Sequence, residues 1–196
     1  MDKTLKRKLF LRKIKYVLKL PFKVVYNFFF CLKYPFWKSR NVWTDKFTGY
    51  KSTLYECIPY GWRKAFGKEL SKNLKKALKL SGELKTFRFL QIKEKYGELR
   101  LYSGGASKPV LDLLSYYELL SLAYCQLCGK PARYCTDGWI SYLCEDCFNK
   151  NPSSGERLTI DDVPKCSKLV DGEWIDTTSD IDFETLWGIQ TEEDLK

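Results

Sequence analysis

Four cysteines in two closely spaced pairs are the side chains of this chain best suited to chemistry. They form the pattern C-x2-C-x15-C-x2-C through Cys125, Cys128, Cys144 and Cys147. Two residues between cysteines allow one tight turn to present both sulfurs to the same ion, and two such turns complete a tetrahedron. Four thiolates fill the coordination sphere of zinc and leave no position for water or substrate. The spacing therefore predicts one structural Zn²⁺ ion, with two redox or disulfide pairs as the alternative.

The segment between the two pairs predicts a zinc ribbon. Residues 133–136 and 139–142 have strand character, and Asp137-Gly138 is a favoured hairpin turn between them. Cys135 falls in the first of these strands, where we expect a small buried side chain and not a fifth ligand. Bound metal would supply much of the folding free energy of this small module, on the order of ~10 kcal/mol.

Histidine is absent from all 196 residues. This excludes Ser-His-Asp and Cys-His nucleophile systems, HExxH metalloproteases and zinc deaminases with a histidine ligand. The sequence also has no glycine-rich phosphate loop. We therefore expect a protein that is not an enzyme and infer no small-molecule substrate, although a mechanism that uses only carboxylates stays open.

Charge is divided sharply along the chain. Residues 1–100 carry a net charge of +19 and residues 101–196 a net charge of −9, which together give the overall +10. Such a division predicts a basic surface for an anionic partner and an acidic tail that covers the surface or stays solvated. The candidate nucleic-acid-binding residues lie on a predicted helix over 62–80 and a predicted hairpin over 86–103: Lys68, Lys72, Lys75, Lys76, Lys79, Lys93, Lys95 and Arg100. The alternative for all of them is an ordinary solvated surface.

Hydrophobic periodicity predicts an α+β fold in four parts. These are a basic amphipathic and aromatic N-terminal region (1–50), an α+β domain with a central helix and the 86–103 hairpin (51–124), the zinc ribbon (125–150) and the acidic tail (151–196). Within them we expect a helix over 5–20 that ends or kinks at Pro21, an apolar stretch over 24–32, a short strand over 53–58 and a helix over 108–123.

The N-terminal region raises the question of a membrane. Lys19, Pro21, Lys23, Asn27 and Lys33 interrupt its apolar residues, so we expect no membrane-spanning helix. Residues 1–36 could still lie on an anionic membrane surface, pack on the rest of the chain or contact nucleic acid. The sequence shows no signal-peptide pattern, and the paired cysteines favour metal binding in a reducing compartment. We therefore expect a cytoplasmic protein.

Several fragments together resemble a group of small phage and prophage zinc-ribbon proteins. The fragments are Ile58–Trp62, Gln91–Tyr102, the CxxCGKP segment from Cys125, Gly138-Trp139 and the closing CxxC. The match covers roughly 55–148, and Tyr96 and Leu101 stand where the group usually or often has Phe. The resemblance implies a phage-encoded protein inside a bacterial host and implies no activity.

Three functions therefore remain open. The first is a binding protein that contacts nucleic acid through its basic half. The second is a protein-interaction module, for example an inhibitor or modulator of a host defence or transcription factor. The third is a peripheral membrane protein attached through residues 1–36.

Overall fold

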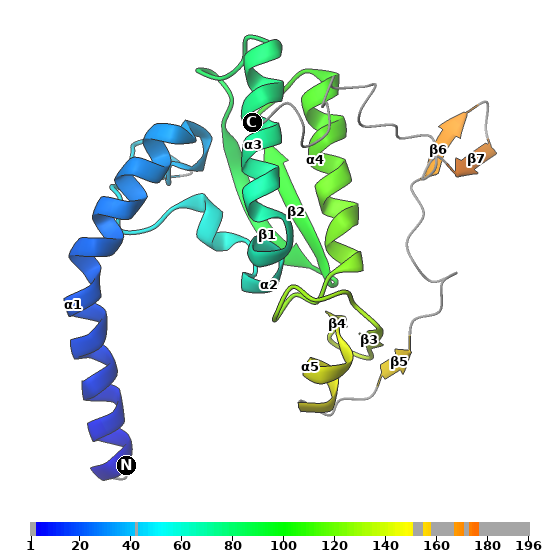
Figure 1. The fold of residues 1–196 in the computed structure, drawn as a ribbon. Coiled ribbons are helices and arrows are strands. Elements are labelled where there is room, and N and C mark those ends of the chain that lie inside the picture. The colour runs from blue at the N-terminus through cyan, green and yellow to red at the C-terminus, as the bar shows by residue number, and fades with distance from the viewer. Residues whose placement is uncertain (1–2, 42, 151–154, 158–166, 171–172, 177–196) are drawn as a thin grey trace, which may run out of the picture.

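Helices and small antiparallel sheets make up the computed structural model, which describes residues 3–41, 43–150, 155–157, 167–170 and 173–176 (Figure 1). The helices are α1 (Lys3–Lys33), α2 (Tyr60–Trp62), α3 (Lys68–Leu80), α4 (Lys108–Leu120) and α5 (Glu145–Lys150). Short 3-10 turns are η1 (Pro35–Trp37), η2 (Leu54–Cys57) and η4 (Ser121–Ala123), and η3 (Arg63–Gly67) is a turn of π-helix. The strands are β1 (Phe89–Lys95), β2 (Glu98–Ser103), β3 (Tyr134–Thr136), β4 (Tyr142–Leu143), β5 (Gly155–Arg157), β6 (Ser167–Val170) and β7 (Glu173–Asp176). The fold class is α+β, as predicted.

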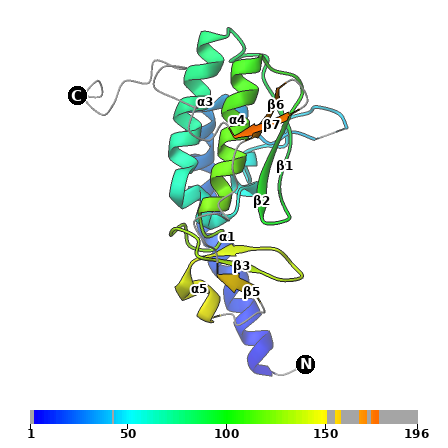
Figure 2. The same ribbon diagram turned by 90° about the vertical axis from the view of Figure 1, so that its right-hand side faces the viewer.

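The body of the protein is a two-layer unit in which α3 and α4 cover one face of the β1–β2 hairpin (Figures 1 and 2). Leu70, Leu74 and Leu78 recur every fourth residue along α3 and are fully buried, because this spacing places them on one helical face. Ile92 from β1 and Leu101 from β2 are paired across the hairpin and also point into the core. The predicted central helix and hairpin are therefore both present and pack on each other.

The hairpin turns where the sequence predicts it. Tyr96 and Gly97 have φ values of 54° and 77°, the left-handed geometry that a two-residue hairpin turn requires. On the helix side, Tyr117 of α4 donates a 2.9 Å hydrogen bond to Glu69 and accepts one of 2.9 Å from Asn73. These bonds fasten α4 to α3 in the layer above the sheet.

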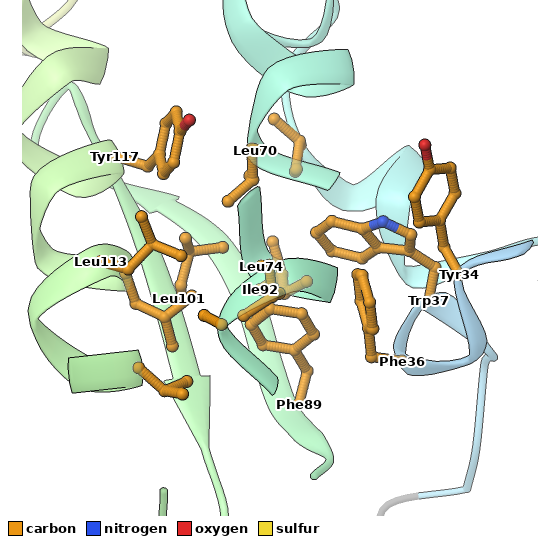
Figure 3. Packing of buried hydrophobic residues seen from close by; sticks show 14 of the residues in the cluster. Tyr34, Phe36, Trp37, Leu70, Leu74, Phe89, Ile92, Leu101, Leu113 and Tyr117 are labelled. Atoms are coloured by element: carbon orange, nitrogen blue, oxygen red, sulfur yellow. The ribbon is translucent and has the colours of Figure 1, made fainter. Parts of the chain in front are cut away.

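The segment after α1 completes the core. Trp37 is fully buried, stacks on Phe89 with ring centroids 5.0 Å apart, and donates from Nε1 to Ser71 Oγ at 3.0 Å (Figure 3). Tyr34 and Phe36 belong to the same cluster of buried residues. The aromatic residues at the end of the N-terminal region therefore cover an edge of the same core that α3, α4 and the hairpin share.

Two local predictions need correction. The helix expected to end or kink at Pro21 does not end there and continues to Lys33, with Pro21 inside α1. The strand expected over 53–58 is the 3-10 turn η2, because Thr53 and Glu56 form a capping box that starts a helical turn. Glu56 accepts a hydrogen bond from the Thr53 backbone in this box.

The predicted helix over 62–80 begins earlier, at Tyr60, and contains the π-helical turn η3 before α3. The acidic tail lies mostly outside the described residues, apart from β5 and the β6–β7 hairpin. Within the described part of the chain, no helix combines the length and the apolar character that crossing a membrane requires.

Candidate metal centre

The four predicted ligands come together. The sulfurs of Cys125, Cys128, Cys144 and Cys147 all lie within 4.8 Å of one another. Zn–S bonds of about 2.3 Å in a tetrahedron place sulfurs roughly 3.8 Å apart, so a small movement of the side chains would accommodate one ion. The donor set and its spacing fit a closed site for a single metal ion, as the sequence predicts.

Backbone hydrogen bonds shape the first cysteine pair into a tight turn. Cys125 N–H donates to the Lys130 carbonyl at 2.8 Å, and Gly129 N–H donates to the Cys125 carbonyl at 2.9 Å. Gly129 has a φ of 79°, a conformation that a residue with a side chain rarely adopts. The turn therefore holds the backbone so that both sulfurs face the same point.

The second pair lies at the start of α5. Cys147 N–H and Phe148 N–H both donate to the Cys144 carbonyl, at 3.1 and 3.0 Å. Across the site, the Lys130 ammonium meets the Asp146 carboxylate at 2.6 Å and so links the two cysteine turns. Both side chains of this ion pair are largely exposed, so it contributes little stability by itself.

Burial determines what charge this cluster could hold. Cys125 and Cys144 are buried, and desolvation raises the pKa of the Cys147 thiol far above its ordinary value. Four neighbouring thiolates would repel one another in such a place, and a bound divalent ion supplies the missing positive charge. Such an ion would stabilise the fold and offer no open coordination position for catalysis.

The ribbon around the site differs in detail from the prediction. Its hairpin has a longer loop than the two-residue Asp137-Gly138 turn, because Thr136 Oγ1 donates to the Trp139 carbonyl at 2.7 Å and Thr136 N–H donates to the Ser141 carbonyl. The strand expected over 139–142 is therefore only β4, at Tyr142–Leu143. Cys135 lies outside the four-sulfur cluster, as expected.

A third strand was missed by the sequence analysis. Strand β5 pairs antiparallel with β3, giving the order β4-β3-β5, although its residues were assigned to the tail. A Cβ atom at Gly155 would lie 2.5 Å from the Cys135 carbonyl oxygen and 3.0 Å from the Phe148 ring. Close packing at Gly155 thus extends the ribbon to residue 157, and three residues were too few to show a strand pattern.

The ribbon is docked tightly on the body. Gly61 N–H donates to the Gln126 carbonyl, and the Trp62 indole N–H donates to the Tyr124 carbonyl, both at 2.9 Å. Gly61 and Gly129 pass each other so closely that a Cβ at Gly129 would lie 2.5 Å from the Gly61 carbonyl oxygen. The first metal-binding turn therefore rests directly on the start of the helical segment that leads into α3.

The turn of the β1–β2 hairpin makes a second contact with the ribbon. A Cβ at Gly97 would lie 2.9 Å from the Tyr142 ring and 3.0 Å from Ile140. Beside this contact is an open pocket of about 260 Å³, lined by Glu94, Lys95, Tyr96, Gly138, Trp139 and Ile140. Tyr96 and Trp139 are 71% and 78% exposed. The sequence analysis missed this pocket because its two walls lie more than forty residues apart in the chain.

The structure does not bring the eight predicted nucleic-acid-binding residues into one surface. Four lysines lie along the outer face of α3 and are exposed: Lys68, Lys72, Lys76 and Lys79. Lys75 instead lies over the Tyr34 ring, 5.6 Å from its centroid. Since the core face of α3 packs toward the hairpin, these four lysines point away from the sheet.

The remaining three residues lie on the other side of the body. Lys93 and Arg100 are paired across the hairpin on the sheet face opposite the helices, and Lys95 is paired with Glu98 on the same face. Arg100 forms ion pairs with Glu98 at 2.6 Å and Glu118 at 3.9 Å, so its charge is largely neutralised. The hairpin residues are therefore a weaker basic surface than α3.

Comparison with models of known protein families, with curated proteins and with solved structures finds no match for this chain. The resemblance to phage zinc-ribbon proteins therefore stays a prediction.

Proposed function

We propose that this chain is a non-enzymatic, zinc-stabilised protein that binds nucleic acid through the lysine row of α3. We define the row as Lys68, Lys72, Lys76 and Lys79. Positions spaced by four and three residues share one face of a helix, and at 1.5 Å per residue the row is about 16 Å long. Among the residues that the structure describes, no ion pair involves Lys68, Lys72 or Lys79. The uncompensated charges of Lys68, Lys72 and Lys79 carry the proposal, because lysine ammoniums bind phosphates as point charges.

The metal centre supports this function indirectly. The ribbon holds Gly61 and Trp62, and the chain runs from them through η3 into α3. A metal ion in the ribbon would therefore fix the start of the helical segment that presents the lysine row. In this proposal zinc is structural, and the phage-protein resemblance implies that the nucleic acid would be met inside a bacterial host.

The test measures binding of the zinc-loaded protein to fluorescent duplex DNA, single-stranded DNA and RNA across a salt series. We expect the triple substitution Lys68→Gln, Lys72→Gln, Lys79→Gln to lower the slope of log K against log salt by about 2 to 3, at roughly 0.9 per lost phosphate contact on duplex DNA. Three such contacts correspond to a roughly 40-fold loss of affinity between about 50 and 200 mM salt.

The matched control replaces Lys46, Lys51 and Lys85 by Gln, which removes the same charge from exposed positions outside the row. If both triple variants weaken binding equally, the effect comes from net charge and the row is not the binding site. If the unaltered protein shows no salt-dependent binding, the proposed function is wrong.

A protein-interaction role is the second candidate, and the pocket between the hairpin and the ribbon is the observation that favours it. Exposed Tyr and Trp side chains beside a hollow are typical anchors of protein interfaces, and here Tyr96 and Trp139 flank one. We would expect Tyr96→Ala with Trp139→Ala to abolish capture of one stoichiometric host protein while DNA binding stays unchanged. Equal capture by the variant and the unaltered protein would contradict this role.

A further inference from the structure

Helix α1 presents a long apolar face to solvent. Leu18, Phe22, Val25, Phe29 and Leu32 are 66%, 79%, 55%, 63% and 58% exposed. Their spacing of four, three, four and three residues places them on one face of the helix. A contiguous exposed apolar patch of this kind marks a surface that another molecule covers.

The body holds α1 by a different face. Asn27 Nδ2 donates to the Tyr50 carbonyl at 2.9 Å, and the Lys23 ammonium meets the Glu56 carboxylate at 2.9 Å. Further along this face Phe30 packs on the Tyr55 ring, with centroids 5.1 Å apart. The helix stands away from the two-layer unit over most of its length (Figure 1). The contacts with residues 50–56 therefore orient α1 and leave its apolar face outward.

The unbroken course of α1 keeps this face in one helical register. The helix runs from Lys3 to Lys33 without ending at Pro21, so Leu18 and the residues beyond Pro21 lie on one continuous row. The helix is 31 residues long, about 46 Å, and the row of exposed apolar side chains lies in its second half.

Charge distinguishes between the possible occupants of this face. Residues 3–33 contain ten Lys and Arg residues and no Asp or Glu. A second copy of α1 would bring the same positive charge and be repelled, whereas an anionic lipid surface attracts the basic residues and accepts the apolar ones. The helix is too polar to cross a bilayer, in line with the absence of a spanning helix among the described residues.

We propose that α1 lies in the surface of an anionic lipid bilayer, with Leu18, Phe22, Val25, Phe29 and Leu32 inserted between the headgroups. This site is separate from the α3 lysine row, and it needs no nucleic acid. The flanking lysines keep their ammonium groups at the level of the lipid phosphates while their methylene stems lie along the apolar region.

The experiment is co-sedimentation of the full, zinc-loaded chain with two kinds of vesicle, one of phosphatidylcholine alone and one of equal parts phosphatidylcholine and phosphatidylglycerol. We expect clear binding to the anionic vesicles and at least tenfold weaker binding to the neutral ones. The double substitution Phe22→Ser, Phe29→Ser should lower the partition coefficient on anionic vesicles by at least about tenfold, because two inserted rings are lost.

A control removes exposed apolar side chains elsewhere, through Trp43→Ser and Leu80→Ser, at positions 92% and 68% exposed. This control should bind anionic vesicles like the unaltered chain. Equal partitioning of the two double variants, or no sedimentation of the unaltered chain with anionic vesicles, would overturn the proposal. A dimer in lipid-free solution that Phe22→Ser, Phe29→Ser abolishes would also overturn it, since a second copy would then be the occupant.

Discussion

Replacing Gly61 by Ala should separate the zinc ribbon from the body while leaving the metal ligands intact. A Cβ atom at this position would meet the Cys125 carbonyl oxygen and lie 2.6 Å from both the carbonyl carbon and the oxygen of Gln126. All of these are backbone atoms of the first metal-binding turn, so no side-chain rotation can relieve the overlap. Either the turn shifts or the contact opens.

The expected loss in the free energy of unfolding can be estimated from the packing and the hydrogen bonds of this contact. Forcing an extra methyl group into a packed site costs about 1–3 kcal/mol. If the contact opens, the hydrogen bonds from Gly61 N–H and from the Trp62 indole are lost, at about 1 kcal/mol each. The gain in helix propensity from Gly to Ala, at most about 1 kcal/mol, acts in the opposite direction. We expect a net loss of about 1–3 kcal/mol, which for a chain of this size lowers Tm by about 2–12 °C.

Two measurements check this on the zinc-loaded protein. Urea unfolding followed by tryptophan fluorescence reports the stability, and competition with a chromophoric chelator counts bound zinc. Gly104→Ala is the matched control, since its new Cβ would lie 3.4 Å from the nearest atom of Leu90, an ordinary contact. That control should change stability by less than about 1 kcal/mol.

The expected pattern is a destabilised Gly61→Ala protein that still binds one zinc ion per chain. A Gly61→Ala protein as stable as Gly104→Ala would refute the close docking of ribbon and body. If Gly61→Ala loses its zinc while the Gly104→Ala control still binds one zinc ion per chain, Gly61 is instead required for the geometry of the metal site itself.

Removal of a bound metal by a chelator, or Cys144→Ser, should unfold the ribbon while α3 and α4 persist. Hydrogen exchange would report this as lost protection confined to residues 125–150 and 155–157, and retained protection there would contradict a structural metal. Desolvation raises the pKa of both the Cys31 thiol, to about 11, and the Cys57 thiol, but Cys31 is buried and Cys57 is exposed. At neutral pH iodoacetamide should therefore label Cys57 well before Cys31, and equal labelling by mass spectrometry would contradict the burial. The hydrogen bond from the Ser107 hydroxyl lowers the pKa of Glu83, so this carboxylate stabilises the fold above its unfolded pKa of about 4.3 and the contribution is lost as pH falls through its lower folded pKa. Glu83→Ala should therefore destabilise the protein at neutral pH, with a difference from the unaltered chain that shrinks in acid; a difference independent of pH would contradict it.

The four-cysteine cluster was the part of the molecule that the sequence predicted best. Two CxxC pairs can be recognised from spacing alone, because each pair needs only its own turn to direct two sulfurs. The α3 helix was equally clear, since Leu70, Leu74 and Leu78 repeat at helical spacing over several turns. Both patterns involve residues that lie close together in the sequence.

Features that depend on distant residues could not be predicted in this way. The strand expected over 53–58 is a 3-10 turn because the Thr53–Glu56 capping box outweighs a short apolar pattern. Strand β5 exists because Gly155 can approach Cys135 closely, a contact that no local pattern reveals. Helix α1 continues past Pro21. Its second half is held in place because Lys23 and Asn27 contact residues 50–56.

The fragments that resemble phage zinc-ribbon proteins meet at one place in the fold. Gly61, Gly97 and Gly129 come from three of these fragments, and at each of them a Cβ would collide with a distant segment of the chain: with residues 125–126 at Gly61, with Tyr142 and Ile140 at Gly97, and with Gly61 at Gly129. The packing of ribbon, hairpin and helix start therefore accounts for these three glycines. The three surfaces proposed for binding lie differently with respect to these fragments. The pocket flanked by Tyr96 and Trp139 lies within them, whereas the lysine row of α3 falls between them and the apolar face of α1 lies before the first of them.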